Sequence, residues 1–336
     1  MRGTRRDVLF GGSAVVAAAA LGPARAAAPL DKLTDAMAHG RFVTYQPSAL
    51  AAINGQLTPA SGDSIRADLS ALKPHFDSLI TYGALAGAER VPDIARALGF
   101  RAVIVGIWSI YDATERANAL ATVARNPDIV AGLSLGNETV LGQRGNWGDL
   151  AYQITALRKE LPSLPVTTTE PFAQYLDNSD ARSALKAMYF MLVNVHPIFE
   201  SWFRSAQAPN WADFVVRVSA RLAQAFPGPI LVKETGVPSG PAASGYDEGM
   251  QHDFWRALES RMPPSAARAF SYFSAFDAPW RVNDVNPVPG AHPEEAHWGL
   301  FTETRTPKRV VTDMPVLQAA AADTLSGAEQ SVGPGR

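Results

Sequence analysis

The chain has 336 residues, of which 47% are hydrophobic, so it can bury the core of one large domain or of two small ones. It contains no cysteine, which excludes disulfides, thiolate catalysis and cysteine-ligated zinc. The formal net charge is −2, and loss of residues 1–26 would remove four arginines and one aspartate and leave −5. A mildly acidic chain is a poor partner for nucleic acid or for an anionic membrane surface.

The N-terminal segment is typical of a twin-arginine export signal. Arg5 and Arg6 precede an apolar stretch from Val8 to Leu21, and Ala24-Arg25-Ala26 places small residues where an export peptidase reads them. We therefore expect cleavage after Ala26 and a periplasmic or secreted bacterial protein with no membrane span after signal removal. The alternative is a cytoplasmic protein with an apolar N-terminal helix.

The remaining chain is expected to form one domain. No internal repeat or interdomain linker is visible, and the C-terminal residues are rich in Ala, Ser and Gly. The predicted organisation is a signal peptide over residues 1–26, a catalytic domain over 27–318 and a disordered tail over 319–336.

Short runs of β-type residues alternate with amphipathic helical stretches through this domain. Most of the runs are apolar and β-branched, as in parallel strands that are buried on both faces. The eight predicted strands are Phe42 to Tyr45, Leu79 to Tyr82, Ala102 to Ile107, Ile129 to Leu135, Val166 to Thr169, about Tyr189 to Val195, Ile230 to Val232 and Phe270 to Phe276.

The simplest closure of eight such strands is a single (β/α)8 TIM barrel, an α/β fold. An open doubly wound sheet is the alternative, but no Gly-x-Gly-x-x-Gly motif follows the first strand.

Two glutamates stand where predicted strands end. The fourth strand runs into Gly136-Asn137-Glu138, and the seventh runs into Lys233-Glu234. Barrel active sites lie at the C-terminal ends of the strands, so both carboxylates should face one mouth from opposite sides of the ring. That arrangement suits cleavage of a glycosidic bond, in which one carboxyl protonates the leaving oxygen and the other attacks the sugar or activates water.

Seven blocks of sequence, taken in order, give the chain a resemblance to a known family. They are Thr81-Tyr82-Gly83, Gly106-Ile107-Trp108, Leu135-Gly136-Asn137-Glu138, Val193-Asn194-Val195-His196-Pro197, Glu234-Thr235-Gly236-Val237-Pro238-Ser239-Gly240, Phe276-Asp277-Ala278-Pro279-Trp280, and His297-Trp298-Gly299-Leu300-Phe301 with Lys308. On these blocks, which span about residues 41–310, the chain resembles glycoside hydrolase family 17, the β-1,3-glucanases and related bacterial β-glucan transglycosylases.

The resemblance implies a retaining double displacement, with Glu138 as general acid/base and Glu234 as nucleophile. The two carboxyl groups of such a pair lie about 5–5.5 Å apart. It also implies that Asn137 contacts the sugar 2-hydroxyl. Release of the glycosyl-enzyme to water is hydrolysis and release to a sugar hydroxyl is transglycosylation, and the same residues serve both reactions.

The two carboxyls should titrate unequally, because an acid must hold its proton while a nucleophile must be ionised. Lys233 is adjacent in sequence to Glu234, which favours the lower pKa for Glu234. Neighbours along a strand point to opposite faces, however, so this pattern leaves open whether Lys233 faces away from the site.

Other side chains near strand ends are candidates for sugar contact, because flat rings cover the apolar face of a pyranose and polar groups bond its hydroxyls. Besides Asn137 they are Tyr82, Asn194, His196, Tyr272, Phe276, Trp280 and Trp298. Sugar contact is favoured for Tyr82 and Trp280. Core packing is an open alternative for Tyr272 and Trp298, as it is for Trp108.

Several positions depart from the family pattern. The usual arginine, aspartate, tryptophan, acidic residue and lysine are replaced by Ile80, Tyr189, Val237, Ala278 and Arg281. Both glutamates are intact, so these departures bear on the sugar subsites more than on the mechanism.

The sequence therefore predicts a monomeric glycosidase that acts on β-glucan, most simply β-1,3-linked. No metal or organic cofactor is expected, because the six histidines show no metal-ligand spacing. A catalytically silent β-glucan-binding protein stays open as an alternative. A doubly wound periplasmic binding protein is a further one, although it would need two lobes and a hinge.

The export signal makes a direct prediction. Replacing Arg5 and Arg6 together by lysine should leave uncleaved precursor in the cytoplasm, because the pathway reads the arginine pair itself. Fractionation followed by immunoblotting checks this, and normal periplasmic recovery of the double variant would contradict it.

Overall fold

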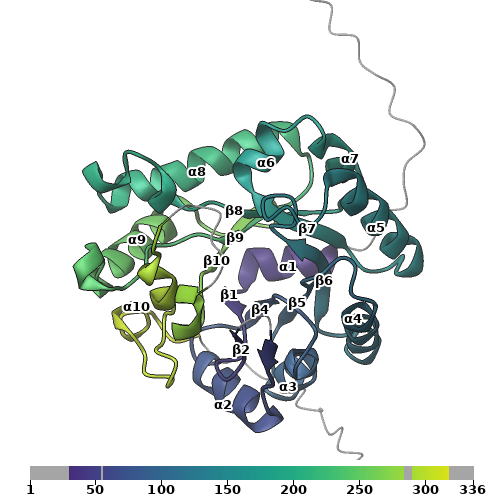
Figure 1. Cartoon of the computed structure of the whole chain (residues 1–336), viewed down its shortest axis with the longest axis horizontal. Coiled ribbons are helices and arrows are strands. Elements are labelled where there is room, and N and C mark those ends of the chain that lie inside the picture. Colours follow the sequence, from purple (N-terminus) through teal and green to yellow (C-terminus); the bar gives the residue numbers. More distant parts are fainter. Residues whose placement is uncertain (1–29, 54–55, 284–289, 318–336) are drawn as a thin grey trace, which may run out of the picture.

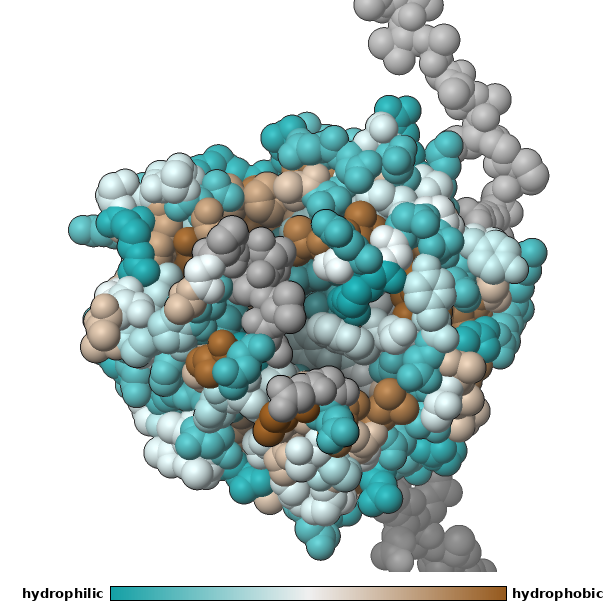
Figure 2. All heavy atoms as spheres, in the orientation of Figure 1, coloured by the Kyte–Doolittle hydropathy of each residue, from teal (hydrophilic) through white to brown (hydrophobic). Residues whose placement is uncertain are grey.

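The computed structural model describes residues 30–53, 56–283 and 290–317. Eight parallel strands close into a barrel in the order β1, β4, β5, β6, β7, β8, β9, β10, with β10 paired back to β1. Helices ring these strands in Figure 1, and the same view in Figure 2 is hollowed near its centre, within the ring of strands. The prediction of a (β/α)8 barrel is confirmed, whereas the predicted signal peptide and tail lie outside the described residues.

The barrel strands follow the predicted runs closely. They are β1 (Phe42–Tyr45), β4 (Ser78–Thr81), β5 (Ala102–Ile107), β6 (Val130–Asn137), β7 (Val166–Pro171), β8 (Met191–Asn194), β9 (Ile230–Glu234) and β10 (Arg268–Tyr272). The main difference is the eighth strand, which ends at Tyr272 and not at Phe276.

The helices are α1 (Asp31–His39), α2 (Gly62–Leu72), α3 (Val91–Ala97), α4 (Ala113–Arg125), α5 (Trp147–Glu160), α6 (Phe172–Leu176), α7 (Ala181–Ala187), α8 (Ala208–Ala225), α9 (Glu248–Arg261) and α10 (Arg309–Thr312). Single 3-10 turns are η1 (Ala88–Arg90), η2 (Pro197–Phe199), η3 (Phe203–Ser205), η4 (Ala242–Ser244), η5 (Pro279–Asn283) and η6 (Pro293–His297). A two-stranded sheet of β2 (Ala51–Ile53) and β3 (Gln56–Thr58), which the sequence pattern did not predict, follows β1. Among the described residues, no helix has both the length and the apolarity that crossing a membrane requires.

Four of the outer helices begin at a side-chain cap. In α2, α4, α5 and α9 the residue before the helix accepts a hydrogen bond from the backbone N–H three positions on, and these residues are Ser61, Asp112, Asn146 and Asp247. Such caps satisfy backbone donors that have no partner inside the helix. They fix where each helix starts after the loop that precedes it.

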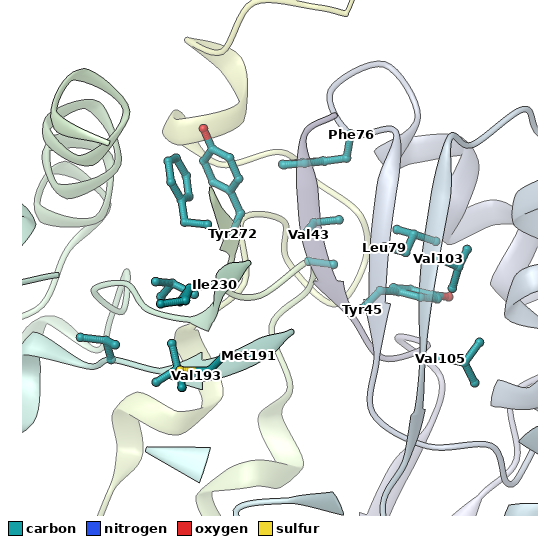
Figure 3. Close-up of a cluster of buried hydrophobic side chains, with 14 of the residues drawn as sticks. Val43, Tyr45, Phe76, Leu79, Val103, Val105, Met191, Val193, Ile230 and Tyr272 are labelled. Atoms are coloured by element: carbon teal, nitrogen blue, oxygen red, sulfur yellow. The ribbon is translucent and has the colours of Figure 1, made fainter. Parts of the chain in front are cut away.

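Alternation along the strands divides the buried side chains into two cores. Side chains on the outer faces of the strands pack under the helices, and Figure 3 labels several of them, including Val43, Leu79 and Val193. Side chains on the inner faces, such as Ile104 and Leu231, form a separate core.

Helix α1 closes the N-terminal end of the barrel. Its buried residues Leu33, Ala36 and Met37 join the inner core, and the helix packs against β5, β6 and β10. The apolar side chains of α1 therefore cover the apolar inner core at this end, and the strands finish at the opposite end.

Because α1 shields apolar side chains of the barrel from water, weakening its packing should lower the stability of the folded protein. Leu33→Ala should lower the free energy of unfolding by about 2–5 kcal/mol, through lost burial and the cavity left behind. Urea unfolding followed by circular dichroism measures this. Asp31→Ala, on the exposed side of the same helix, is the control and should stay within about 0.5 kcal/mol of the unaltered chain. Equal effects of the two substitutions would contradict the sealing role.

Candidate active site

Glu138 is placed by an irregular end of β6. Ser134 pairs with Thr167 but Asn137 pairs with Thr169, so β6 holds one more residue than β7 over this stretch. Such bulges re-aim side chains at barrel rims. Gly136 and Glu138 both have left-handed backbone, with φ of 78° and 51°. A glutamate in this region is strained, and this kind of strain gathers at functional sites.

Only glycine fits at position 136. A Cβ atom there would lie 2.4 Å from the Thr139 hydroxyl and 3.2 Å from the Ile110 side chain, in addition to the positive φ. The turn that presents Glu138 is therefore built from a residue with no side chain.

Glu234 is placed by a second bulge. Val193 of β8 pairs with Val232 of β9, but the next residue, Asn194, pairs with Glu234. Leu231 lies in the inner core, so Lys233 points into the barrel by alternation, and the extra residue turns Glu234 inward as well. Lys233 therefore faces the site, which answers the question left open by the sequence.

Asn194 links the two glutamates. Its side-chain amide donates a 2.8 Å hydrogen bond to Glu138 Oε1, although the two residues come from strands that are separated by β7. Since Asn194 is also the strand partner of Glu234, the carboxyl of Glu138 reaches across the mouth toward that of Glu234. The structure thus brings together the two residues that the sequence selected.

Positively charged and hydrogen-bonding groups surround Glu234. Lys233 Nζ lies 3.6 Å from its Oε1, and His196 Nε2 lies 3.6 Å from its Oε2. Burial alone would raise the pKa of Glu234, but His196, Lys233 and Arg281 together lower that pKa to about 2. The groups around Glu234 therefore favour its carboxylate form over its protonated form.

Glu138 has the opposite environment. Burial and then the negative charge of Glu234 raise the pKa of Glu138, and these effects outweigh the hydrogen bond from Asn194. One carboxyl thus favours its proton and the other its charge. Such a pair separates the roles of acid and nucleophile.

Several of the other residues that were predicted to contact the sugar lie beside this pair. Asn137 Oδ1 accepts from Lys233, and the ring of Tyr82 lies 4.1 Å from the same ammonium. The rings of His196 and Trp298 lie 5.2 Å apart, with Trp298 buried behind the histidine. Trp280 lies on η5, in the segment after β10, and is half-buried.

Two residues that were predicted to contact the sugar, Tyr272 and Phe276, are buried in the outer core. Tyr272 belongs to the outer core, where its hydroxyl donates to Glu259 of α9 and its ring lies 4.5 Å from that of Trp255. Phe276 packs edge-on against Tyr45, with ring centres 6.2 Å apart. Alternation explains Tyr272, because Ala269 points into the barrel and residues one or three positions further along the strand, Phe270 and Tyr272, point outward.

Sequence reasoning missed Glu170, a fully buried carboxyl at the end of β7. It accepts hydrogen bonds from the backbone N–H groups of Val140 and Leu141, at 2.8 and 3.2 Å, in the loop that follows Glu138. Glu170 therefore fixes the backbone of the loop that follows Glu138. Only its position at a strand end could have drawn notice to it.

Trp108 at the end of β5 was left undecided and is 44% exposed. The guanidinium of Arg144 lies 4.5 Å over its ring and also donates to the backbone carbonyl of Asn137. The carboxyl of Glu115 accepts from the backbone N–H groups of Trp108 and Ser109. This open ring is held rigidly beside the loop of Glu138.

A (β/α)8 barrel with two unequally titrating glutamates at its mouth is the architecture of a glycoside hydrolase. The chain belongs to the family described as the BtgE/BtgC glycoside hydrolase domain, whose model matches residues 43–299. A glucan 1,3-beta-glucosidase of Arthroderma benhamiae is 30% identical over 261 residues, which cover 72% of this chain and 82% of that protein.

Solved structures agree on the fold. A β-1,3-glucanosyltransferase of Rhizomucor miehei, an active-site mutant in complex with laminaritriose, matches with a TM-score of 0.62 and 20% identity, over 80% of this chain and 96% of that one. An endo-laminarinase from Formosa matches with a TM-score of 0.61 and 19% identity, over 81% and 86%. The resemblance to glycoside hydrolase family 17 is confirmed.

The buried Glu170 makes stability depend on pH. Burial raises the pKa of Glu170 to about 7, so the folded state holds this proton more tightly than the unfolded state. Relative to Glu170→Gln, the unaltered protein should be most stable below pH about 4.5 and should lose about 3 kcal/mol as the pH rises through 7.

Urea unfolding of both proteins at several pH values between 4.5 and 8 measures this difference. Glu303→Gln, at an exposed carboxyl, is the control and should follow the unaltered protein at every pH. Parallel stability curves for the unaltered protein and Glu170→Gln would contradict the prediction.

Proposed function

We propose that this enzyme acts on β-glucan, with β-1,3 links as the first choice, by a retaining double displacement. The observation that carries the proposal is the pairing of Glu138 and Glu234 in one mouth with opposite electrostatic environments. The relatives support the substrate class, since they include a glucan 1,3-beta-glucosidase, an endo-laminarinase and a β-1,3-glucanosyltransferase.

In the first step Glu138 donates its proton to the leaving glycosidic oxygen while Glu234 attacks the anomeric carbon. The raised pKa of Glu138 favours the protonated form that this step needs. Asn137, fixed by Lys233, directs its amide toward the sugar beside the pair. In the second step Glu138, now ionised, takes a proton from the incoming water or sugar hydroxyl, and the glycosyl–Glu234 bond breaks.

Transglycosylation would use the same residues. It is the second candidate for the activity of this enzyme, because one structural relative is a β-1,3-glucanosyltransferase. Product analysis on laminarin, β-1,6-glucan and mixed-link glucan separates the two. Longer products indicate transfer, and reducing sugars alone indicate hydrolysis. Nuclear magnetic resonance of the first-formed anomer should show retention, and an inverted product would exclude a glycosyl-enzyme.

We also propose that the enzyme works outside the cytoplasm. The twin-arginine pattern of residues 1–26 supports this, as does a cysteine-free chain whose fold needs no disulfide.

The roles of the glutamates can be separated by substitution. Glu234→Ala removes the nucleophile, so glucan turnover should vanish, yet an α-glucosyl fluoride should still be transferred because it fills the emptied space. Glu138→Ala removes the acid. The rate of glucan cleavage should therefore fall far more than the rate with an activated aryl glucoside, whose leaving group needs little protonation.

Initial rates on both substrate types measure these effects, with circular dichroism to confirm folding. Equal loss of both substrate types in Glu138→Ala would show that its role is assigned wrongly. Undiminished glucan cleavage by Glu234→Ala would remove the proposal.

A further inference from the structure

Lys233 is an unusual residue for its place in the barrel. Its side chain has an exposed fraction of 1% and lies in the barrel interior, directly beside the reacting carboxylate. Lysine is almost never this buried unless it is paired, because an ammonium loses its hydration on burial. Burying the ammonium costs desolvation free energy, which indicates that its charge has a function in the site.

Three groups contact the ammonium. It donates a 2.6 Å hydrogen bond to Asn137 Oδ1, lies 3.6 Å from Glu234 Oε1 and lies 4.1 Å from the centre of the Tyr82 ring. These partners come from β6, from β9 and from the end of β4, so the lysine joins three sides of the site.

We propose that Lys233 is a positioning residue of the glycosidase reaction, which orients the Asn137 amide as a donor toward the sugar and keeps Glu234 in its ionised form. The inference rests on the proposed function and deepens it. In this proposal Lys233 makes no bond to the sugar and acts through the side chains of Asn137 and Glu234.

The orientation of Asn137 follows from its hydrogen bond. Lysine can only donate, so the amide oxygen must face Lys233 and the NH2 group must face away from it. Within the described part of the chain, that NH2 group forms no hydrogen bond and is left to donate to a sugar hydroxyl. Asn137 can then select substrates that offer an acceptor oxygen next to the anomeric carbon.

The ionisation of Glu234 follows from the charges around it. Lys233 lowers the pKa of Glu234 against the effect of burial, together with His196 and Arg281. Arg281 is shared with Glu295 at 2.9 Å, and His196 lies on the other side of the carboxyl. The titratable or charged groups that act on Glu234 are Lys233 of β9, Tyr82, Glu138, His196 and Arg281.

Two substitutions separate the two tasks. Lys233→Met keeps the length of the side chain but removes both charge and donor, whereas Lys233→Gln removes the charge and keeps a donor for Asn137 Oδ1. Lys159→Met, at an exposed lysine of α5, is the matched control. Each protein is assayed for kcat/KM against pH with an aryl β-glucoside and with its 2-deoxy analogue.

As the pH is lowered, we expect both Lys233 variants to lose activity earlier, that is, at a higher pH, than the unaltered enzyme does. The acid limb of kcat/KM should move up by at least about one pH unit, because the nucleophile becomes easier to protonate. Lys233→Met should also lose at least about tenfold of the preference for the 2-hydroxyl substrate, the amount that one hydrogen bond commonly provides. Lys233→Gln should keep that preference, and Lys159→Met should match the unaltered enzyme in both measurements.

A folded Lys233→Met enzyme with the unaltered acid limb and substrate preference would overturn the inference. If the methionine variant does not fold, an unshifted acid limb in Lys233→Gln overturns it equally. Failure of the proposed function looks different, because the unaltered enzyme would then turn over no glucoside or Glu234→Ala would stay active.

Discussion

The site depends on one electrostatic arrangement, in which a buried ammonium lies between an amide and a carboxylate inside a closed barrel. Lys233 offsets part of the cost of burying Glu234, and Glu234 in turn offsets part of the cost of burying Lys233. Burial and the charge of Glu234 then raise the pKa of Glu138, so its environment favours the protonated form more than that of Glu234 does. Removing any one of these three groups would therefore change the pKa values of the other two, so the pKa values of Glu138 and Glu234 are coupled.

Buried carboxylates also hold the loops of the mouth in place. Glu115 of α4 accepts from the backbone of the segments after β4 and β5, and Glu170 accepts from the segment after β6. Asp68 of α2 accepts from Ser48 after β1, and Asp277 pairs with Lys308 and accepts from Gly299. Backbone donors that are buried at strand ends need partners. In this barrel acidic side chains supply them, and the loops are held rigidly without disulfides.

The sequence was sufficient to predict the barrel and its glutamates, because apolar β-branched runs are local and both glutamates immediately follow such runs. The bulges in β6 and β9 could not be predicted, since one extra residue in a strand leaves the hydrophobic pattern almost unchanged. For the same reason the direction of Lys233 stayed open, and Tyr272 was placed in the mouth although it points outward. Glu170 was missed because its function lies in backbone hydrogen bonds to a loop 30 residues away in sequence.

Helix α1 determines by which end of the barrel substrate and product can reach or leave the site. Because it stops the N-terminal end with Leu33, Ala36 and Met37, the mouth beside Glu138 and Glu234 serves as both entrance and exit. In a double displacement the departing sugar must then clear the same opening through which water or an acceptor sugar arrives. In the proposed reaction, the choice between hydrolysis and transglycosylation then depends on which acceptor, water or a sugar, enters through this one opening. Trp108, which is 44% exposed and is linked through Arg144 to the backbone of Asn137, presents a flat apolar ring beside this opening.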